Sequence, residues 1–169
     1  MARMRIYIPL TYRDLFGDVI ARKVAFSVTK SIQETYLPQG VPEKEHMEYW
    51  EHIAMTHASA QSAYMVKELY RENACEEDVC VRIVAAADID AAHIKEDENI
   101  LGCINLVDDV KWSQVVSLHL DGSDISDYIT AFLHASDEGT SDKALEKLLE
   151  YPLLWFDISE LDDLRQAFS

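Results

Sequence analysis

Residues 6–11 read IYIPLT, a short apolar run that ends in a proline and a threonine. Pro9 has no backbone N–H to donate to a sheet, so it marks the end of a strand or an edge position. Thr11 follows where a helix cap belongs, and Asp14 falls in the first turn, where a negative charge suits the helix dipole. The stretch therefore predicts a strand that stops near Pro9 and a helix over residues 12–23.

The same alternation of strand and helix continues along the chain. Apolar runs and period-two patterns predict strands over residues 5–8, 24–28, 79–88, 101–107, 115–120 and 153–158. Helical patterns cover residues 12–23, 32–37, 43–73, 124–135, 142–150 and 160–167, whereas residues 90–99 are polar and irregular or a short helical turn. Ser31 and Glu34 have the spacing of a capping box at the start of the second of these helices.

This alternation predicts an α/β (α+β) fold in a single globular domain over residues 1–169. We expect a single mixed sheet of about five or six strands covered by helices. One long helix near residues 43–73 is expected to lie across the sheet as a spine. The two adjacent strands between residues 101 and 120 indicate at least one antiparallel pair.

Composition excludes several classes of protein. The chain has 15 basic and 31 acidic residues, a formal charge of −16, so a phosphate backbone or an anionic membrane would be repelled. The longest apolar runs fall far short of the roughly 20 residues of a membrane helix, and none reaches the roughly 7–15 of a signal peptide. We therefore expect a soluble, cytoplasmic protein that binds neither nucleic acid nor membrane.

The three cysteines, Cys75, Cys80 and Cys103, show no metal-binding C-x-x-C spacing. Reduced thiols, buried or half-buried, are the expected state in a cytosolic protein. Cys75 and Cys80 flank an acidic turn that would raise a thiol pKa, which argues against a nucleophilic cysteine there.

Several predicted strands finish on a polar residue just before a helix. Asp88, Asp121 and Asp157 stand at three such ends, where ligands bind in open α/β sheets and where carboxylates could gather around a divalent cation. Thr, Ser and Asp are also the ordinary caps of helix N-termini, and we favour capping. Asp88 and Asp90 are spaced as in phosphotransferring enzymes with an aspartyl nucleophile, but Ala92 occupies the place of the expected threonine.

The long helix carries three of the six histidines. Glu48 and His52 are four residues apart and adjacent on its surface, so they could supply two metal ligands, although a solvated helix pair is the favoured interpretation. His57 lies on the apolar stripe formed by Trp50, Ile53, Ala54, Ala58, Met65 and Leu69, and we expect a hydrogen-bonded core or boundary histidine there. His119 and His134 receive no predicted role.

Five segments resemble, in order, a family of small uncharacterised actinobacterial proteins. They are YIPLT, FSVTKSI, VAAAD, SLHLD and LLWFDISEL. That family opens with a Y-[VI]-P-L-T strand and closes with an L-L-W-[YF] strand, and the longer acidic segment 136–143 of this chain departs from its usual pattern. The resemblance implies a bacterial cytosolic protein with one compact domain, and carries no assigned activity, cofactor or catalytic residue.

Our first functional hypothesis is a binding or protein-interaction domain with an acidic surface, whose partner is an unknown protein or a second copy in a homodimer. No phosphate-binding loop, dinucleotide fingerprint, nucleophile elbow or kinase signature is present, so no catalytic residue, metal or cofactor is predicted, and the balance is against an enzyme. The alternative is a small metal-assisted hydrolase using Asp88, Asp121 and Asp157. A third hypothesis, a regulator that mimics nucleic acid, requires the negative charge to lie on one face.

Overall fold

The computed structural model describes residues 2–169. Its strands are β1 (Arg3–Leu10), β2 (Val19–Ile20), β3 (Val24–Ser27), β4 (Ile83–Asp90), β5 (Ile94–Glu96), β6 (Cys103–Leu106), β7 (Val110–Lys111), β8 (Val115–Leu120) and β9 (Leu154–Asp157). Its α-helices are α1 (Lys30–Thr35), α2 (His46–Arg71), α3 (Ser126–His134), α4 (Glu138–Leu149) and α5 (Leu161–Ala167). Short 3₁₀ helices include η1 (Tyr12–Phe16), η2 (Glu43–Glu45), which leads into α2, and η7 (Ile158–Glu160).

The main sheet has seven strands in the order β5-β6-β3-β1-β4-β8-β9. The α+β class and the long helix are thus confirmed, but the expectation of a mixed sheet of five or six strands was wrong, because every neighbouring pair is antiparallel. The reason is topological: β3 and β4, which α1 and α2 connect, run in the same direction, but β1 lies between them and pairs with both. This split β–α–β arrangement removes the parallel contact.

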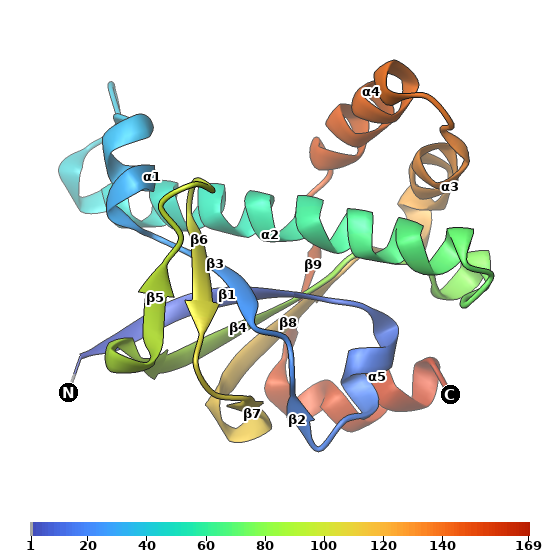
Figure 1. The fold of residues 1–169 in the computed structure, drawn as a ribbon, viewed down its shortest axis with the longest axis horizontal. Helices are drawn as coiled ribbons and strands as arrows, with labels where there is room; N and C mark the ends of the chain where they lie inside the picture. Colours follow the sequence, from blue (N-terminus) through green and yellow to red (C-terminus); the bar gives the residue numbers. More distant parts are fainter. Residues whose placement is uncertain (1) are drawn as a thin grey trace.

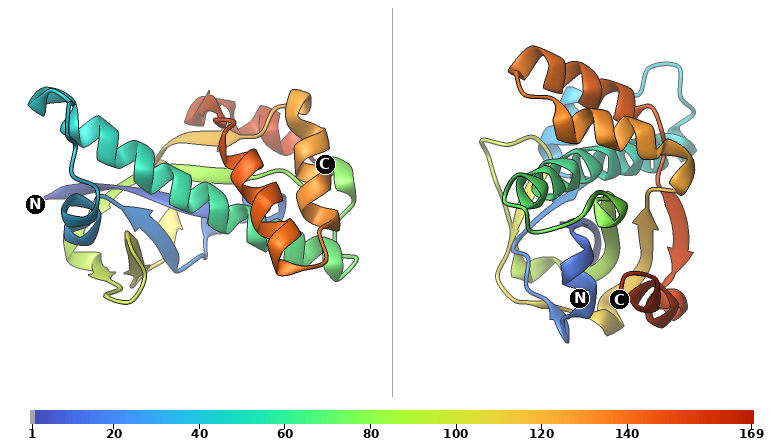
Figure 2. Two further views of the ribbon diagram at one scale, coloured as in Figure 1. Left: turned by 90° about the horizontal axis from the view of Figure 1, so that it is seen from above. Right: turned by 90° about the vertical axis from the view of Figure 1, so that its right-hand side faces the viewer.

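Helices cover the two faces of this sheet unequally (Figure 1). α2 crosses one face with α1 at its end, and α3 and α4 pack beyond the C-terminal half of α2. Figure 2 shows the same layering from above and from the side. The opposite face is covered by α5, η1 and the small β2–β7 sheet, and its core contains Ile6, Ile8, Leu10, Ala85, Leu118 and Leu161. No helix described for residues 2–169 is both long and apolar enough to cross a bilayer.

Small side chains let α2 approach the sheet closely. Ala54 and Ala58 are fully buried against Tyr7, Phe26 and Ala86. The predicted apolar stripe is correct in this first half of the helix. In the second half, the buried residues instead contact the sheet or pack toward α3 and α4; they are Ser62, Ala63, Val66 and Lys67. His57 is half-buried over the Phe26 ring, with centroids 6.0 Å apart, and desolvation lowers its pKa. The predicted boundary position is therefore confirmed, whereas the hydrogen bond predicted for this histidine is not found within residues 2–169.

Local predictions failed where tertiary contacts decide the backbone. The helix expected over residues 12–23 is only the single turn η1, because the chain turns at Gly17 and then pairs Val19 and Ile20 with β7. The polar segment 90–99 contains a missed strand, β5, which forms one edge of the sheet.

Two helix starts also differ from expectation. The Oγ1 of Thr29, not Ser31, accepts the hydrogen bond that caps α1, from the N–H of Ile32. The Ser31 hydroxyl instead accepts from the Gly102 N–H in the β5–β6 turn, so the predicted capping box was wrong. α4 begins four residues before the predicted start, because Asp137 caps it by accepting from the Thr140 N–H.

Candidate functional site

A cavity of about 650 Å³ lies where α2 leaves part of the sheet uncovered. α2 packs over β1, β3 and β4, whereas β8 and β9 extend beyond it. One wall is the first half of α2, the opposite wall is segment 149–153 between α4 and β9, and the sheet is the floor. The floor residues are Arg5, Tyr7, Ala86, Ser117, His119 and Trp155.

Strand register explains why these side chains meet. Tyr7 pairs with Ala86, Ala86 pairs with Ser117, and His119 pairs with Trp155, so each pair shares a face of the sheet. In β1 the flanking residues Ile6 and Ile8 point to the other face and are fully buried. The polar side chains of the cavity floor are thus the alternate positions of strands whose remaining residues build the core.

The cationic group of Arg5 is already neutralised. Its Nε donates to Asp88 Oδ1 at 2.6 Å and its Nη2 to Asp88 Oδ2 at 3.1 Å, the bidentate geometry of a strong pair. This hydrogen bond is the main cause of a raised Arg5 pKa and of a lowered Asp88 pKa. Arg5 therefore contributes hydrogen-bond donors to the cavity but little net charge.

Tyr7 holds a glutamate of α2 in place. Its hydroxyl donates to Glu51 Oε2 at 3.1 Å. Burial raises the Tyr7 pKa, and the Glu51 carboxylate raises it further, so the phenol stays protonated and remains a donor. Within residues 2–169, Glu51 Oε1 receives no hydrogen bond. Glu51 thus lines the cavity with a carboxylate that Tyr7 orients through one of its two oxygens.

Ser117 and His119 form a polar pair on β8, with Ser117 Oγ 2.9 Å from His119 Nε2. Burial, with a smaller effect of the Arg5 charge, lowers the His119 pKa to about 4, so the imidazole is neutral near pH 7. Such a weak base, with no third group found on its other ring nitrogen within residues 2–169, lacks the arrangement that activates a serine nucleophile. The pair contributes neutral hydrogen-bonding groups to the floor.

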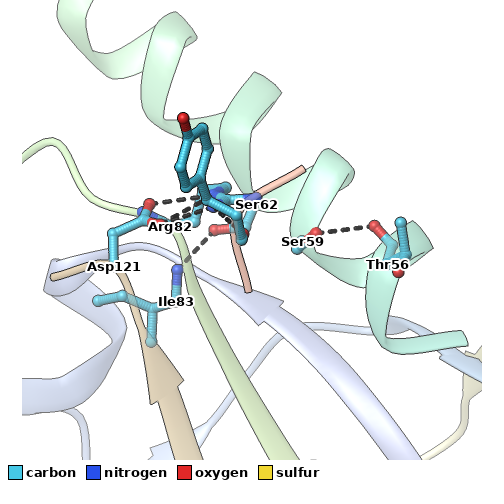
Figure 3. Close-up of polar contacts among 7 residues, drawn as sticks. Thr56, Ser59, Ser62, Arg82, Ile83 and Asp121 are labelled. Carbon is cyan, nitrogen blue, oxygen red and sulfur yellow. Dashed lines mark hydrogen bonds and ion pairs between the residues drawn. The ribbon is translucent and has the colours of Figure 1, made fainter. Parts of the chain in front are cut away.

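Buried polar contacts fix the far side of the cavity (Figure 3). Arg82 and Asp121 form a buried ion pair, with Nη2 and Oδ1 2.7 Å apart, and the same guanidinium donates to the Tyr151 carbonyl at 3.0 Å. Ser62 of α2 accepts from the Ile83 N–H at 2.9 Å, as Figure 3 shows. Its hydroxyl also donates to the Leu10 carbonyl at 2.7 Å. These contacts hold α2, the sheet and segment 149–153 together.

The three strand-end aspartates do not form one site. Asp88 pairs with Arg5, Asp121 pairs with Arg82, and Asp157 accepts from the Ser159 N–H at the start of η7. Residues 2–169 contain no group of three or more His, Cys, Asp or Glu side chains placed to hold a metal. Helix capping describes Asp157 only, because Asp88 lies inside β4 and Asp121 binds a guanidinium.

Glu48 and His52 lie one helical turn apart and both line the cavity. They would give a metal two ligands, but the described part of the chain contains no set of three His, Cys, Asp or Glu side chains arranged to hold a metal ion. Glu51, which lies between them in the sequence of α2, lines the same cavity.

Sequence reasoning gave no role to most of the cavity residues, including Arg5, Tyr7, Glu51 and Trp155. The signal for the first two was present in the RIYIPL run, where Arg5 and Tyr7 alternate with the buried isoleucines. Glu51 and Trp155 could not be assigned, because they come together with β1 only through the crossing of α2 and the pairing of β9.

Residues 4–164 match the model of the Family of unknown function (DUF6912). No curated protein and no solved structure gives a significant match.

Proposed function

The chain belongs to the family of unknown function DUF6912, and we propose that it is a binding domain whose cavity takes up a positively charged group. The match covers β1 to most of α5 and so includes every element that builds the cavity. It brings no activity with it, so the proposal rests on the chemistry of the side chains alone.

The charge balance of the cavity carries this proposal. Glu48, Glu51 and Glu150 line it from both walls. The two cationic side chains of the lining are each engaged by an aspartate, Arg5 by Asp88 and Arg82 by Asp121. Because His119 is neutral, the carboxylates set the sign of the potential, although Lys147 partly offsets Glu150 from a solvent-exposed position.

Aromatic and apolar groups suggest the rest of the ligand. Tyr7, Tyr151 and Trp155 line the cavity together with Met55 and Leu153. An aromatic face attracts a cation, and it also covers an alkyl chain. An alkylammonium or guanidinium on an apolar stem, such as a lysine or arginine side chain, combines both features. Glu51, oriented by Tyr7, is the carboxylate best placed to receive the cation.

The alternative of a metal-assisted hydrolase gains no support, because Asp88, Asp121 and Asp157 each have a different local partner. We keep the bacterial cytosol as the proposed setting. Three free cysteines, two of them buried, suit a reducing compartment.

The experiment is a titration of ¹⁵N-labelled protein with N-acetyl-lysine methylamide and with agmatine, followed by amide chemical shifts. The neutral N-acetyl-norleucine methylamide serves as the ligand control. We expect shifts that map to the amides of Tyr7, Glu51 and Trp155 for the two cations and much smaller ones for the neutral analogue. Glu51→Gln should weaken the binding of both cations about tenfold, the value of one charged hydrogen bond.

Glu68→Gln is the matched protein control, because Glu68 is exposed on the same helix and lies outside the cavity. It removes the same charge and should leave the affinity within about twofold, as expected for a screened surface charge. Equal binding of the norleucine analogue, or equal losses in Glu51→Gln and Glu68→Gln, would show that the cavity does not select a cation.

A further inference from the structure

β9 is an edge strand whose outer side is unpaired. It stands last in the sheet and pairs only with β8. Within residues 2–169, the only other hydrogen bond of its backbone amides runs from the Asp157 N–H to Glu160 Oε2, at 2.8 Å. That N–H therefore points away from β8. Because orientation repeats every second residue in an antiparallel ladder, the N–H and C=O of Trp155 also point outward.

The two edges of the sheet differ in a way that bears on function. Exposed edges are normally protected by charged side chains that discourage further pairing. The opposite edge, β5, has this protection in its exposed Lys95 and Glu96. β9 has instead Leu154 and Trp155, which are 51% and 62% exposed. A large exposed aromatic side chain on an edge without charged protection is typical of an edge strand that pairs with another polypeptide when the protein functions.

The free edge adjoins the cavity. Trp155 lines the cavity and pairs with His119 of its floor. A further strand beside β9 would continue the sheet, so every second side chain of that strand would project on the same face as Trp155. These side chains would project toward the β9 side of the cavity, whose lining there includes Glu150.

We propose that β9 pairs with an extended, basic segment of a partner protein, whose alternate lysine or arginine side chains lie on the cavity face. This rests on the proposed function and names the partner as a polypeptide. Main-chain hydrogen bonds to β9 would contribute to the affinity, and the acidic cavity would select basic side chains of the partner. We infer a basic partner because this chain has a formal charge of −16. The same charge disfavours pairing with a second copy of this chain at the edge.

The test uses fluorescein-labelled peptides and fluorescence anisotropy. The main probe has the sequence Lys-Thr-Lys-Val-Lys-Thr-Lys, with both ends blocked, which places its lysines on one face when extended. An isomer with the same composition but contiguous lysines, Lys-Lys-Lys-Lys-Thr-Val-Thr, keeps the charge and loses the alternation. We expect the alternating peptide to bind at least about tenfold more tightly, because only it combines pairing with a lysine-bearing face.

Backbone methylation distinguishes pairing from electrostatic attraction. Two further peptides carry N-methyl groups on the amides of the odd or of the even residues. Only one set of N–H groups can face β9, so we expect one methylated peptide to lose at least about tenfold in affinity and the other to retain binding. Amide hydrogen exchange at Trp155 should slow on binding of the unmethylated peptide.

Several results would overturn the inference. Strand pairing would be contradicted if the two methylated peptides lost equal affinity or if the contiguous-lysine isomer bound as tightly as the alternating peptide. Unchanged amide exchange at Trp155 would contradict it as well. A dimer in sedimentation experiments that the peptide cannot dissociate would make a second copy the occupant. The proposed function is judged separately, because N-acetyl-lysine methylamide has no strand to pair and should shift the cavity amides whatever the peptides do.

Discussion

Arg82 and Asp121, which are 39 positions apart in the chain, form an ion pair with side chains only 2% and 0% exposed. The carboxylate also accepts from the Arg82 backbone N–H at 2.9 Å, and the guanidinium donates to the Tyr151 carbonyl at 3.0 Å. One charge pair thus joins β4, the end of β8 and the segment that forms the far wall of the cavity.

Asp121→Asn should therefore be strongly destabilising. The substitution leaves a buried guanidinium without its counter-charge, a loss of about 3–5 kcal/mol in the free energy of unfolding. Urea denaturation provides the measurement. Asp109→Asn is the control, because Asp109 pairs with Lys23 on the surface and should cost less than about 1 kcal/mol. Similar losses for the two variants would contradict the structural role of the buried pair.

Ser62→Ala should loosen the contact of α2 with the sheet. The hydroxyl bonds to the Leu10 carbonyl and to the Ile83 N–H, so its removal leaves two buried backbone groups unpaired, at a cost of about 2–4 kcal/mol. Ser59→Ala is the control on the same helix: Ser59 is also buried, but its hydroxyl donates only to the Thr56 carbonyl within the helix. Its loss should be below about 1 kcal/mol, and the idea fails if the two variants unfold at the same urea concentration.

The elements with a strong local pattern were predictable from the sequence. Isoleucines alternating with Arg5 and Tyr7 specify β1, and the apolar run through Ala85 specifies a buried central strand. The long helix was predictable from its period. Burial of Ser62 and Lys67 was not, because both depend on partners far away: Leu10 for the first and the Ala135 carbonyl for the second.

The candidate site shows a more specific failure. Aspartates at strand ends meet only if the strands are parallel, since antiparallel neighbours end at opposite edges of the sheet. Asp88 lies near the end of β4, and Asp121 directly follows the adjacent antiparallel strand β8, so the two aspartates lie toward opposite ends of these strands. The neighbouring strands of the sheet are all antiparallel because β1 lies between β3 and β4, which run in the same direction. No local sequence pattern predicts this strand order. Glu48 and His52 of α2 were named in advance only as a possible ligand pair, and the sequence did not predict that they line a cavity.

His119 should make stability depend on pH. Its folded pKa of about 4 lies below the ordinary value of 6.5, so the unfolded chain binds the proton more readily. The neutral imidazole therefore contributes to the free energy of unfolding fully above about pH 6.5, and this contribution is lost as the pH falls toward about 4. Because the side chain is partly exposed to solvent, we expect the loss to be on the order of 2 kcal/mol. Urea midpoints measured at about pH 5 and about pH 7.5 should differ more for the natural chain than for His119→Gln. Equal differences would contradict a neutral, buried imidazole.

Cys75 and Cys80 should form a disulfide on mild oxidation. Their sulfur atoms lie 2.6 Å apart, and Cys75 is partly exposed. The Cys75 thiolate would attack oxidised glutathione and release one glutathione; the Cys80 thiolate would then attack the mixed disulfide and release the second. Burial raises the Cys80 pKa, so closure should speed up with rising pH. Intact mass should show a loss of two hydrogens, and a stable glutathione adduct on Cys75 at alkaline pH would contradict closure. Cys75→Ser should abolish the reaction, whereas Cys103→Ser should not.

Tyr7 and Glu51 should act as a unit in cation binding. Tyr7→Phe removes the donor that orients Glu51, so N-acetyl-lysine methylamide should bind more weakly, by about two- to fivefold, with the sheet intact because the ring remains. Tyr64→Phe is the control, since Tyr64 is exposed on α2 outside the cavity. In a Tyr7→Phe background, Glu51→Gln should cost less than it does alone, because the carboxylate is no longer held toward the ligand. Additive losses would mean that Glu51 receives the cation without help from Tyr7.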